Sequence, residues 1–511
     1  MTPKASATSA QPKGAPDVRA RLETARALYE ARRAAEALIP AQQAVAMAPD
    51  DSDAIALLDA IQTALATGDP AVVKLELTAV LNPDDGANQL ALGEAYAVLD
   101  RSQDAERCFK RALALGRVRE AHADLAELYL AVAMLDAADH HAHLVLSAPD
   151  EGRDDDTLVA IACQTLAATC EARDERRQAK LWLDKAYGRR SLFRQPCPGA
   201  AFTTLVLATR GQGNISYGQL MPRGAFDRTV WYMEHARDDQ LAELGDYTVV
   251  LNAIGDPDIA QASRPKVDDF LGGCIRPVLN PPDRIAMTFR HRIGETLAAI
   301  PDLVAPRTLR LSADEIAEGP GVAAARAGLG WPVIARPTGS HGGKGLVLVE
   351  DAAELDIIAS EPDADAYVTA FHDYRSPDGF YRKYRMIFVD RRPYAYHLAI
   401  GPHWMVHHRS AEMANDPARI AEELAFLRDP QTAIGARAMA AIRAIGIRLD
   451  LDYGGIDFGL TTDGQVLLFE ANATMLTHLE PADGPFSAKN PFIEPILRAF
   501  QAHLTARAGG G

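Results

Sequence analysis

A change in sequence character near residue 200 constrains the fold of this chain more than any other feature. Residues 17–190 are rich in Ala, Leu, Glu and Arg, with apolar residues at helical spacing and almost no strand-like alternation. From Ala200 onward, AFTTLVLATRGQGN has the pattern of an apolar β-branched strand followed by a glycine-rich turn, which is how α/β domains usually open. We therefore expect an all-helical region followed by an α/β region, with the boundary near residues 196–198.

A repeat of about 34 residues runs through the helical region. Pro49 and Pro83, each after an apolar helix, lie 34 residues apart, and Pro149 follows 66 residues later, close to two further units. Small and aromatic residues between the second and third prolines fall where a tetratricopeptide repeat places its packing residues. These residues are Leu92, Gly93, Tyr96, Ala105, Phe109 and Ala112. We expect a solenoid of about four or five helical hairpins, with a generic helical bundle as the alternative.

Composition excludes several classes of protein. With 48% hydrophobic and 24% charged residues the chain should be globular, and its formal charge of −16 disfavours a broad surface for nucleic acid or anionic lipid. The five cysteines form no CxxC pair, and no apolar run is long enough for a signal peptide or a membrane-spanning helix. We expect a cytoplasmic protein with reduced thiols and with flexible tails at residues 1–16 and 506–511.

Residues 331–348, WPVIARPTGSHGGKGLVL, carry one of two motifs with phosphate or metal chemistry. The pattern predicts a strand that ends in a cation, a glycine-rich loop and a second strand. Backbone N–H groups of such a loop can approach phosphate oxygens closely, while Arg336 and Lys344 add positive charge. It is not a Walker A loop, because Thr338 stands where glycine is required and Gly345 follows the lysine. A structural hairpin without a ligand is the alternative.

Residues 454–475, GGIDFGLTTDGQVLLFEANATM, carry the second motif. Two predicted strands flank the turn TTDG, and Glu470 and Asn472 are two residues apart, so they face the same side of one strand. Asp457 lies on the paired strand. Three converging oxygen-bearing side chains suit Mg²⁺ bound together with nucleotide phosphates, and burying them in an apolar strand without a partner would be costly.

The two motifs resemble the ATP-grasp superfamily, which includes D-alanine-D-alanine ligase and glutathione synthetase, over residues 200–500. The most specific part is the pattern DF(x)nGxxxxxExN, present as Asp457, Phe458, Gly464, Glu470 and Asn472. The resemblance implies a multidomain protein. We expect a tetratricopeptide-like helical domain at 17–195 from the repeat, followed, as the resemblance implies, by a pre-ATP-grasp α/β domain at 199–283 and an α+β ATP-grasp domain at 284–505. Further strands predicted within 247–256 and 274–280 fit the second of these domains.

The resemblance also implies a nucleotide site for ATP. Residues 339–345 would cover the phosphates, and Arg336, where the family usually has Lys, would contact them together with Arg290, with Arg292 as the alternative. The backbone of residues 367–374 would hold adenine, with Ala370 where an acidic residue is usual. The implied nucleotide-binding set is Arg290, Arg336, Ser340, Gly342, Gly343, Lys344, Gly345, Ala370 and Phe371.

Catalytic and substrate residues follow from the same resemblance. Arg385, with Lys383 on the same face of a predicted strand, would face the transferred phosphoryl group or the substrate carboxylate; a solvated edge strand is the alternative. Asp457, Glu470 and Asn472 would hold Mg²⁺, with two ions expected. Gly455 stands where D-alanine-D-alanine ligase has an arginine, so the cation that stabilises the intermediate must come from elsewhere. His397, His407 and Arg409 are candidate substrate-facing residues.

The implied activity is that of a carboxylate–amine ligase. Mg²⁺-ATP would phosphorylate a carboxylate, an amine would attack the acyl phosphate, and ADP and phosphate would be released. The substrates would be small molecules or peptides, with the helical repeats recruiting a peptide or protein partner or forming a homodimer contact. Two alternatives stay open: a small-molecule kinase of the same superfamily, and a repeat scaffold with a degenerate nucleotide-binding module.

Overall fold

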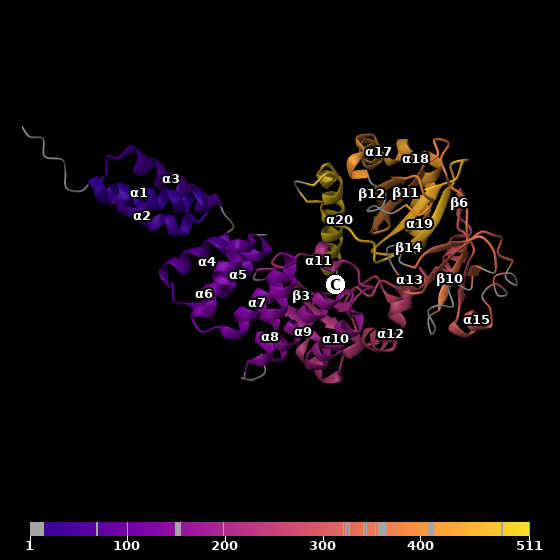
Figure 1. Cartoon of the computed structure of the whole chain (residues 1–511), viewed down its shortest axis with the longest axis horizontal. Coiled ribbons are helices and arrows are strands. Elements are labelled where there is room, and N and C mark those ends of the chain that lie inside the picture. Colours follow the sequence, from indigo (N-terminus) through magenta and orange to yellow (C-terminus); the bar gives the residue numbers. More distant parts are fainter. Residues whose placement is uncertain are drawn as a thin grey trace, which may run out of the picture. The chain divides into compact units, whose positions relative to one another are not determined.

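The computed structural model consists of two compact units, Met1–Arg190 and Ser191–Gly511 (Figure 1). The residues that the structure describes are 15–67, 70–99, 101–148, 155–197, 199–319, 321, 324, 328–340, 343, 345–352, 354–355, 365–406, 413–481 and 484–509. The five cysteines are free, as expected. In the described part of the chain, no helix combines the length and the apolar character needed to cross a membrane.

The first unit is helical throughout its described residues, and consecutive helices pack against one another through short turns. The predicted helical hairpins are therefore confirmed, whereas their assignment as tetratricopeptide repeats stays a prediction. The helices are α1 Ala15–Glu30, α2 Ala34–Met47, α3 Ser52–Thr67, α4 Pro70–Leu81, α5 Gly86–Val98, α6 Ser102–Ala114, α7 Val118–Ala131, α8 Leu135–Ser147, α9 Asp155–Ala172 and α10 Arg176–Arg189.

The α5–α6 hairpin shows why small residues are required at its crossing. Gly93 on α5 faces Phe109 on α6, and a Cβ atom built at Gly93 would lie only 2.7 Å from Cδ1 of that ring. Ala105 and Ala112 of α6 are fully buried in the same cluster. Tyr96 is buried beside them, and its hydroxyl donates to Glu76 of α4 at 2.7 Å. The close approach of the two helices thus depends on the absence of a side chain at Gly93.

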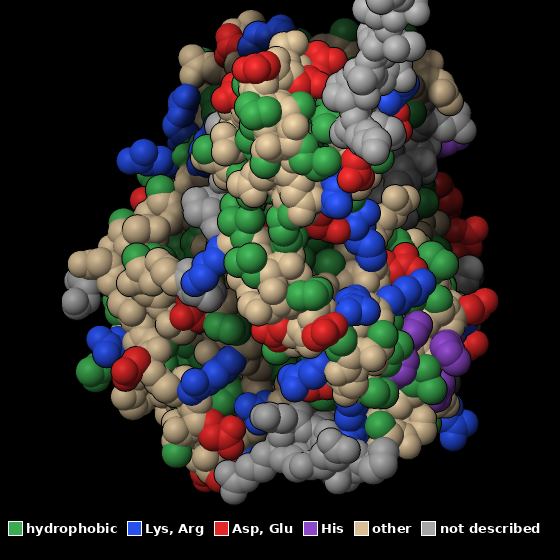
Figure 2. Space-filling view, turned by 90° about the vertical axis from the view of Figure 1, so that its left-hand side faces the viewer, with side chains coloured by type: hydrophobic (Ala, Val, Ile, Leu, Met, Phe, Trp, Pro, Cys, Tyr) green, Lys and Arg blue, Asp and Glu red, His purple; other side chains and the backbone are tan. Residues whose placement is uncertain are grey.

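Four histidines lie together on α7 and α8. Nδ1 of His122 is 2.9 Å from Nδ1 of His141, whose ring also stacks on Tyr129 and contacts the edge of His140. His143, further along α8, packs edge-on against Trp182. Figure 2 shows histidine side chains gathered in one patch, while acidic and basic side chains are mixed over the same face. Since the two facing Nδ1 atoms share one hydrogen bond, only one of these two nitrogens carries a proton.

The second unit begins with a five-stranded sheet in the order β1-β3-β2-β4-β5, parallel except for β1. β1 pairs with β3, so residues 192–195 belong to this unit and not to the helical domain, which was expected to reach residue 195. The strands are β1 Leu192–Gln195, β2 Thr203–Ala208, β3 Asp227–Tyr232, β4 Val249–Asn252 and β5 Val278–Leu279. The helices around them are α11 Tyr217–Leu220, η1 Met233–His235, η2 Asp238–Glu243, α12 Pro257–Gly272, α13 Pro282–Ala286 and α14 Ile293–Leu297.

Two further sheets complete the second unit and, together with the first, confirm the predicted fold class. The second sheet is antiparallel in the order β7-β10-β8-β9, and the third has the order β12-β11-β13-β14-β6. Their strands are β6 Leu303–Val304, β7 Thr308–Leu311, β8 Val333–Pro337, β9 Val347–Val349, β10 Ala366–Ala370, β11 Tyr381–Val389, β12 Arg392–Gly401, β13 Tyr453–Leu460 and β14 Val466–Asn472. The other helices in the described part of this unit are α15 Ala313–Glu318, η4 Met413–Asn415, α17 Pro417–Arg428, α18 Pro430–Ile434, α19 Ala436–Leu449, η5 Ser487–Lys489 and α20 Asn490–Gly509.

One hydrophobic core joins the first and third sheets. Val206 and Leu251 of the first sheet, Ile456 of the third and Phe500 of α20 all belong to it. α20 continues to Gly509, because Leu504 and Ala508 are buried on its inner face; the described residues of the expected C-terminal tail are therefore helical. The second sheet has a separate core around Val333, Ala335 and Val368.

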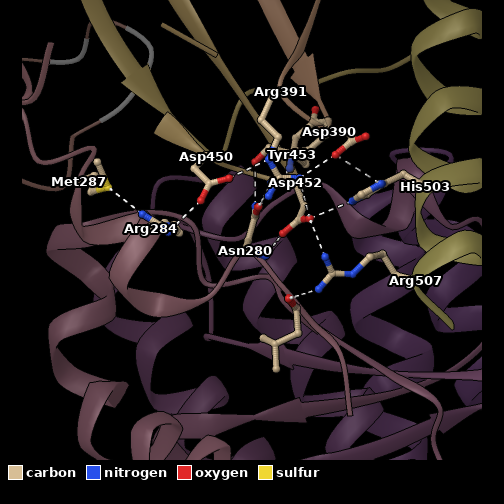
Figure 3. Close-up of polar contacts among 11 residues, drawn as sticks. Asn280, Arg284, Met287, Asp390, Arg391, Asp450, Asp452, Tyr453, His503 and Arg507 are labelled. Atoms are coloured by element: carbon tan, nitrogen blue, oxygen red, sulfur yellow. Dashed lines mark hydrogen bonds and ion pairs between the residues drawn. The ribbon is translucent and has the colours of Figure 1, made fainter. Parts of the chain in front are cut away.

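A buried polar hub centred on Asp452 fixes the start of β13 (Figure 3). Asn280, after β5, donates its N–H to Asp452 Oδ2 at 2.8 Å and accepts the N–H groups of Asp452 and Tyr453 on its own Oδ1. His503 of α20 and Arg391 of the β11–β12 turn also contact the Asp452 carboxylate. Burial would raise the pKa of Asp452, but His503, the Asn280 N–H and Arg391 outweigh it and lower that pKa. The hub ties three segments to the strand that carries Asp457.

We predict that Gly93→Ala destabilises the α5–α6 hairpin by about 1 to 3 kcal/mol, because the new methyl group overpacks against Phe109. Native-state hydrogen exchange of α5 and α6 amides measures the change. Gly188→Ala in α10 is the control, since a Cβ there meets no atom within 4 Å. That change should be neutral or stabilising, and equal effects of the two substitutions would contradict the packing described above.

The first unit should lose stability as the pH falls from about 6.5 to about 4. Burial, then the charges of His122 and His140, lower the pKa of His141 to about 4 from an ordinary 6.5. The unfolded chain therefore takes up this proton first, so the stability is present above pH 6.5 and is lost on acidification. Exchange of α7 and α8 amides at several pH values checks this. His141→Gln should flatten the profile, whereas His143→Gln should not.

Candidate active site

Four polar side chains form one row across the third sheet. In the strand register, Glu470 of β14 lies opposite Asp457 of β13, which lies opposite Arg385 of β11, which lies opposite His397 of β12. Residues paired in this way share a face, with Cβ atoms about 4.5 to 5.5 Å apart. Asn472, opposite Gly455, is on the same face two residues further along β14. The register thus brings together the carboxylates, the amide and the arginine that the sequence analysis singles out.

Asp457 is the most deeply buried acid of the row, with a side chain only 3% exposed. Its Oδ1 accepts from Arg385 Nε at 2.6 Å, and its Oδ2 accepts from Arg385 Nη2 and from Lys383 Nζ, each at 2.9 Å. Burial would raise the pKa of Asp457, but the charges of Arg385 and Lys383 prevail and hold that pKa far below its usual range. The carboxylate therefore stays ionised at any physiological pH.

Glu470 pairs with Arg290, and both side chains are about one-fifth exposed at 20% and 21%. Burial would raise the pKa of Glu470 and Asp457 repels its charge, yet Arg290 prevails and the pKa is lowered. Arg292, the alternative for the nucleotide contact, instead lies 5.7 Å from the ring centre of Phe289. The geometry therefore places Arg290 in the site.

Arg336 leaves the end of β8 and turns toward the glycine-rich loop. Its Nε and Nη2 donate to Ser340 Oγ at 3.2 and 3.1 Å, and Nη2 also reaches the Ser340 carbonyl. Burial, and then the charge of Arg290, lower the pKa of Arg336 to about 10. Gly343 and Gly345 have φ values of +77° and +68°, which other residues rarely adopt. Two neighbouring guanidinium groups whose charges repel each other provide a strong site for an anion.

These residues surround a pocket of about 420 Å³, within the range of ligand-binding cavities. Its described lining includes the charged side chains of Arg290, Arg336, Lys383, Arg385, Asp457 and Glu470. The same lining includes apolar and aromatic residues, among them Ile334, Leu346, Ala370, Phe371, Trp404, Met405, Leu467 and Leu468. The pocket therefore suits a ligand that has both anionic groups and a flat apolar part.

Trp404 is a pocket residue that the sequence analysis did not single out. Its ring packs edge-on against Phe371, with ring centres 5.9 Å apart, and its carbonyl accepts the hydroxyl of Tyr374 at 2.6 Å. The residue follows His403 in the segment after β12, which ends at Gly401. An aromatic residue in this segment was the available signal, although single apolar residues are common on protein surfaces.

The oxygen donors of the row fit a hard divalent cation. Asp457 and Glu470 offer ionised carboxylates on neighbouring strands, and Asn472 adds an amide oxygen that accepts from Thr474 Oγ1 at 3.2 Å. Mg²⁺ prefers such oxygens and usually takes one or two carboxylates together with substrate phosphates. No group of three or more His, Cys, Asp or Glu among the described residues could hold a metal, so the fit rests on this mixed set. Asn472 itself lies outside the described pocket lining.

His397 does not reach the pocket, contrary to its expected substrate-facing role. It is 6% exposed, and its Nδ1 lies 2.7 Å from Oε1 of Glu423 on α17, which Lys489 also contacts at 3.1 Å. The ring is thus held by the Glu423 carboxylate, and His397 is outside the described pocket lining. The other candidates Gly342, Lys344, His407 and Arg409 lie outside the described residues.

Comparisons with known proteins give similarity to solved structures alone, since no family model and no curated protein matches the chain. It is similar to a RimK domain ATP-grasp protein from Sphaerobacter thermophilus, with 18% identity over 59% of this chain and 99% of that chain, and a TM-score of 0.36. It is also similar to the D-cycloserine synthetase DcsG (13%, 60%, 99%, TM-score 0.37) and to the VanG D-Ala:D-Ser ligase from Enterococcus faecalis (12%, 60%, 99%, 0.35). The first of these is described as an ATP-grasp protein, the superfamily whose motifs this sequence resembles.

Arg336→Gln should weaken the binding of inorganic tripolyphosphate by about tenfold or more, since a hydrogen bond to a charged group is worth about 1.5 to 3 kcal/mol. Isothermal titration calorimetry at low salt measures the affinity. Arg392→Gln is the matched control, because that arginine is exposed at the start of β12 and lies outside the described pocket lining. Equal loss in both variants would mean that the anion binds by general surface charge.

Proposed function

We propose that the protein is an ATP-dependent carboxylate–amine ligase. The observation that carries the proposal is the composition of the pocket lining. In its described part, four cations and two ionised carboxylates occur together with aromatic and aliphatic side chains. A nucleoside triphosphate likewise combines charged phosphates with a flat base.

The reaction takes place in two steps. An oxygen of the substrate carboxylate attacks the γ-phosphorus of ATP, the bond to the β–γ bridging oxygen breaks, and ADP leaves with that oxygen. The nitrogen of an amine then attacks the acyl carbon and loses a proton, the bond from the carbon to the phosphate oxygen breaks, and inorganic phosphate leaves. No nucleophile of the protein is required.

The cations of the site have separate tasks in this scheme. Arg336, with the glycine loop and Ser340, binds the polyphosphate, and Arg290 joins it from the side of Glu470. Arg385 and Lys383 hold the substrate carboxylate beside the transferred group and stabilise the charge that develops on it. Two Mg²⁺ ions held by Asp457, Glu470 and Asn472 would neutralise charge on the β and γ phosphates. Gly455 offers no cation, so we assign the stabilisation of the intermediate to Arg385.

The salt bridges of the site imply that nucleotide and metal bind cooperatively. Each carboxylate that would bind metal is already paired with a cation that has a task in the reaction. Glu470 pairs with Arg290, which would bind the polyphosphate, and Asp457 pairs with Lys383 and Arg385, which would contact the transferred phosphoryl group and the substrate carboxylate. When a phosphate takes the cations, the carboxylate oxygens become available to the metal, and the reverse also holds. The same exchange makes either ligand bind weakly alone.

We further propose that the substrate is a small molecule or a peptide, with the helical unit recruiting a peptide or protein partner. Support for a separate recruiting unit comes from its compactness, since residues up to Arg190 pack among themselves. Stacked helical hairpins present extended surfaces of the kind that bind peptide segments.

Thermal unfolding with and without Mg²⁺-ATP tests the nucleotide site without knowledge of the substrate. Because the ligand binds the folded state, saturation should stabilise the native chain, by about 2.7 kcal/mol at a hundred times Kd. Glu470→Gln should lose most of this shift and its dependence on Mg²⁺. Glu494→Gln, an exposed α20 residue paired with Arg498, should keep both.

Product analysis then separates the candidate activities. A ligase releases ADP and phosphate only when a carboxylate and an amine are both supplied, whereas a kinase leaves the phosphate on its product. The absence of a shift at millimolar nucleotide in the native chain would remove the ligase proposal and favour the scaffold alternative.

A further inference from the structure

The second sheet forms a layer of its own against the rest of the unit. Among the described residues, its core draws on β7, β8, β9, β10 and the segments that connect them, and shares no member with the core of the first and third sheets. This separate core comprises Leu311, Ile316, Ala324, Leu329, Val333, Ala335, Val349, Leu355, Ala366 and Val368. Because the two cores do not merge, specific polar contacts must determine how the layer is held.

Asp258, in the first turn of α12, makes such a contact. The hydroxyl of Tyr367 on β10 lies 2.9 Å from each of its carboxylate oxygens, and Nη1 of Arg310 on β7 lies 3.1 Å from Oδ1. Arg310 also donates from Nε to Asp365 at 3.0 Å, which fixes the guanidinium within the second sheet. Three hydrogen-bond distances therefore converge on one carboxylate from two strands of the layer.

The two residues that contact Asp258 share a row of the second sheet with a residue of the pocket. In the register, Tyr367 lies opposite Arg310 on one side and opposite Arg336 on the other, so the three side chains occupy one face in the order β7, β10, β8. Arg336 lines the pocket, whereas Tyr367 and Arg310 contact Asp258. Tyr367 is therefore one strand from Arg336, about 5 Å at the usual spacing, and Arg310 is two strands from it, about 10 Å.

Hydrogen bonds of the preceding loop hold the backbone at Asp258 in place. Asp256 caps α12 by accepting the N–H groups of Asp258 and Ile259, and the N–H groups of Gly255 and Asp256 donate to the carbonyl of Gly213, at 2.9 and 3.1 Å. These loops follow β4 and β2 at the carboxyl edge of the first sheet, where parallel α/β sheets take their ligands. The backbone that carries Asp258 therefore belongs to the first sheet, and the Asp258 carboxylate contacts the second sheet.

We propose that Asp258 is a positioning residue that docks the second sheet onto the first and thereby sets Arg336 over the nucleotide phosphates. This role rests on the proposed function as far as the nucleotide is concerned. The docking itself does not, because it requires only the contact with Tyr367 and Arg310. A bound substrate at the carboxyl edge of the first sheet would act on the nucleotide site through this residue.

The test compares Asp258→Asn and Tyr367→Phe with Asp268→Asn. The last residue is exposed on the same helix and pairs with Arg264 at its surface. Hydrogen exchange of the amides at 308–311 and 366–370 reports on the docking, and calorimetric affinity for Mg²⁺-ATP reports on the placement of Arg336. We expect both changes at the contact to accelerate exchange and to weaken affinity by about tenfold, with no effect of the control. The double variant should be no weaker than the single ones, since they remove one shared contact.

Each other result overturns some or all of the role. Unchanged exchange in both contact variants overturns the docking. Faster exchange with unchanged affinity for Mg²⁺-ATP overturns the proposal that this contact sets the position of Arg336. If the native chain binds no nucleotide, the proposed function fails while exchange still decides the docking, because faster exchange in the contact variants alone supports it. Asp258→Glu, which keeps the charge, should recover a share of the native affinity, and a loss as large as that of Asp258→Asn would show a merely structural role.

Discussion

The arrangement of the second unit depends on one buried carboxylate and the two cations that neutralise it. An unpaired ionised carboxylate in a sheet interior would cost several kcal/mol, so Asp457 is compatible with folding only where Arg385 lies opposite it and Lys383, two residues along β11, also reaches it. That requirement sets the register of β11 against β13, since a slip by one residue would turn both cations to the other face. The β13–β14 pairing then carries Glu470 into the same row, with an irregularity at Asp457 and Phe458.

The sequence identified the residues of the site whose partners are signalled by local patterns. Glu470 and Asn472 stood out because they interrupt an apolar strand, and Arg385 because polar residues alternate before it. Residues that depend on distant segments were missed. Tyr367 lies 109 residues from Asp258, and Asn280 lies 172 residues from Asp452. His397 was misjudged for the same reason, since the burial that Glu423 gives it comes from a helix 26 residues later.

The fold, like the site, was predictable where the signal in the sequence is local. A helical period sustained over many residues is a strong signal, and the hairpins of the first unit follow from it. In the second unit, the strands expected within 247–256 and 274–280 are present as β4 and β5, although β5 comprises only Val278–Leu279. The sequence analysis did not predict β3, although β3 is longer than β4 and β5. The pairing of β1 with β3 could not be read from the chain, because tertiary contact alone stabilises so short an edge strand.

Gly455 gives the site an evolutionary consequence. A Cβ atom at this position would lie 2.6 Å from the Met386 carbonyl and 2.8 Å from Cγ of Met475, so the backbones of β11 and β13 leave no room for any side chain. With this close packing, arginine cannot replace Gly455 in a single substitution, because the central strands β11 and β13 would first have to move apart. A positive charge at this point of the sheet can therefore come from the neighbouring strand β11, where Arg385 lies, and not from position 455.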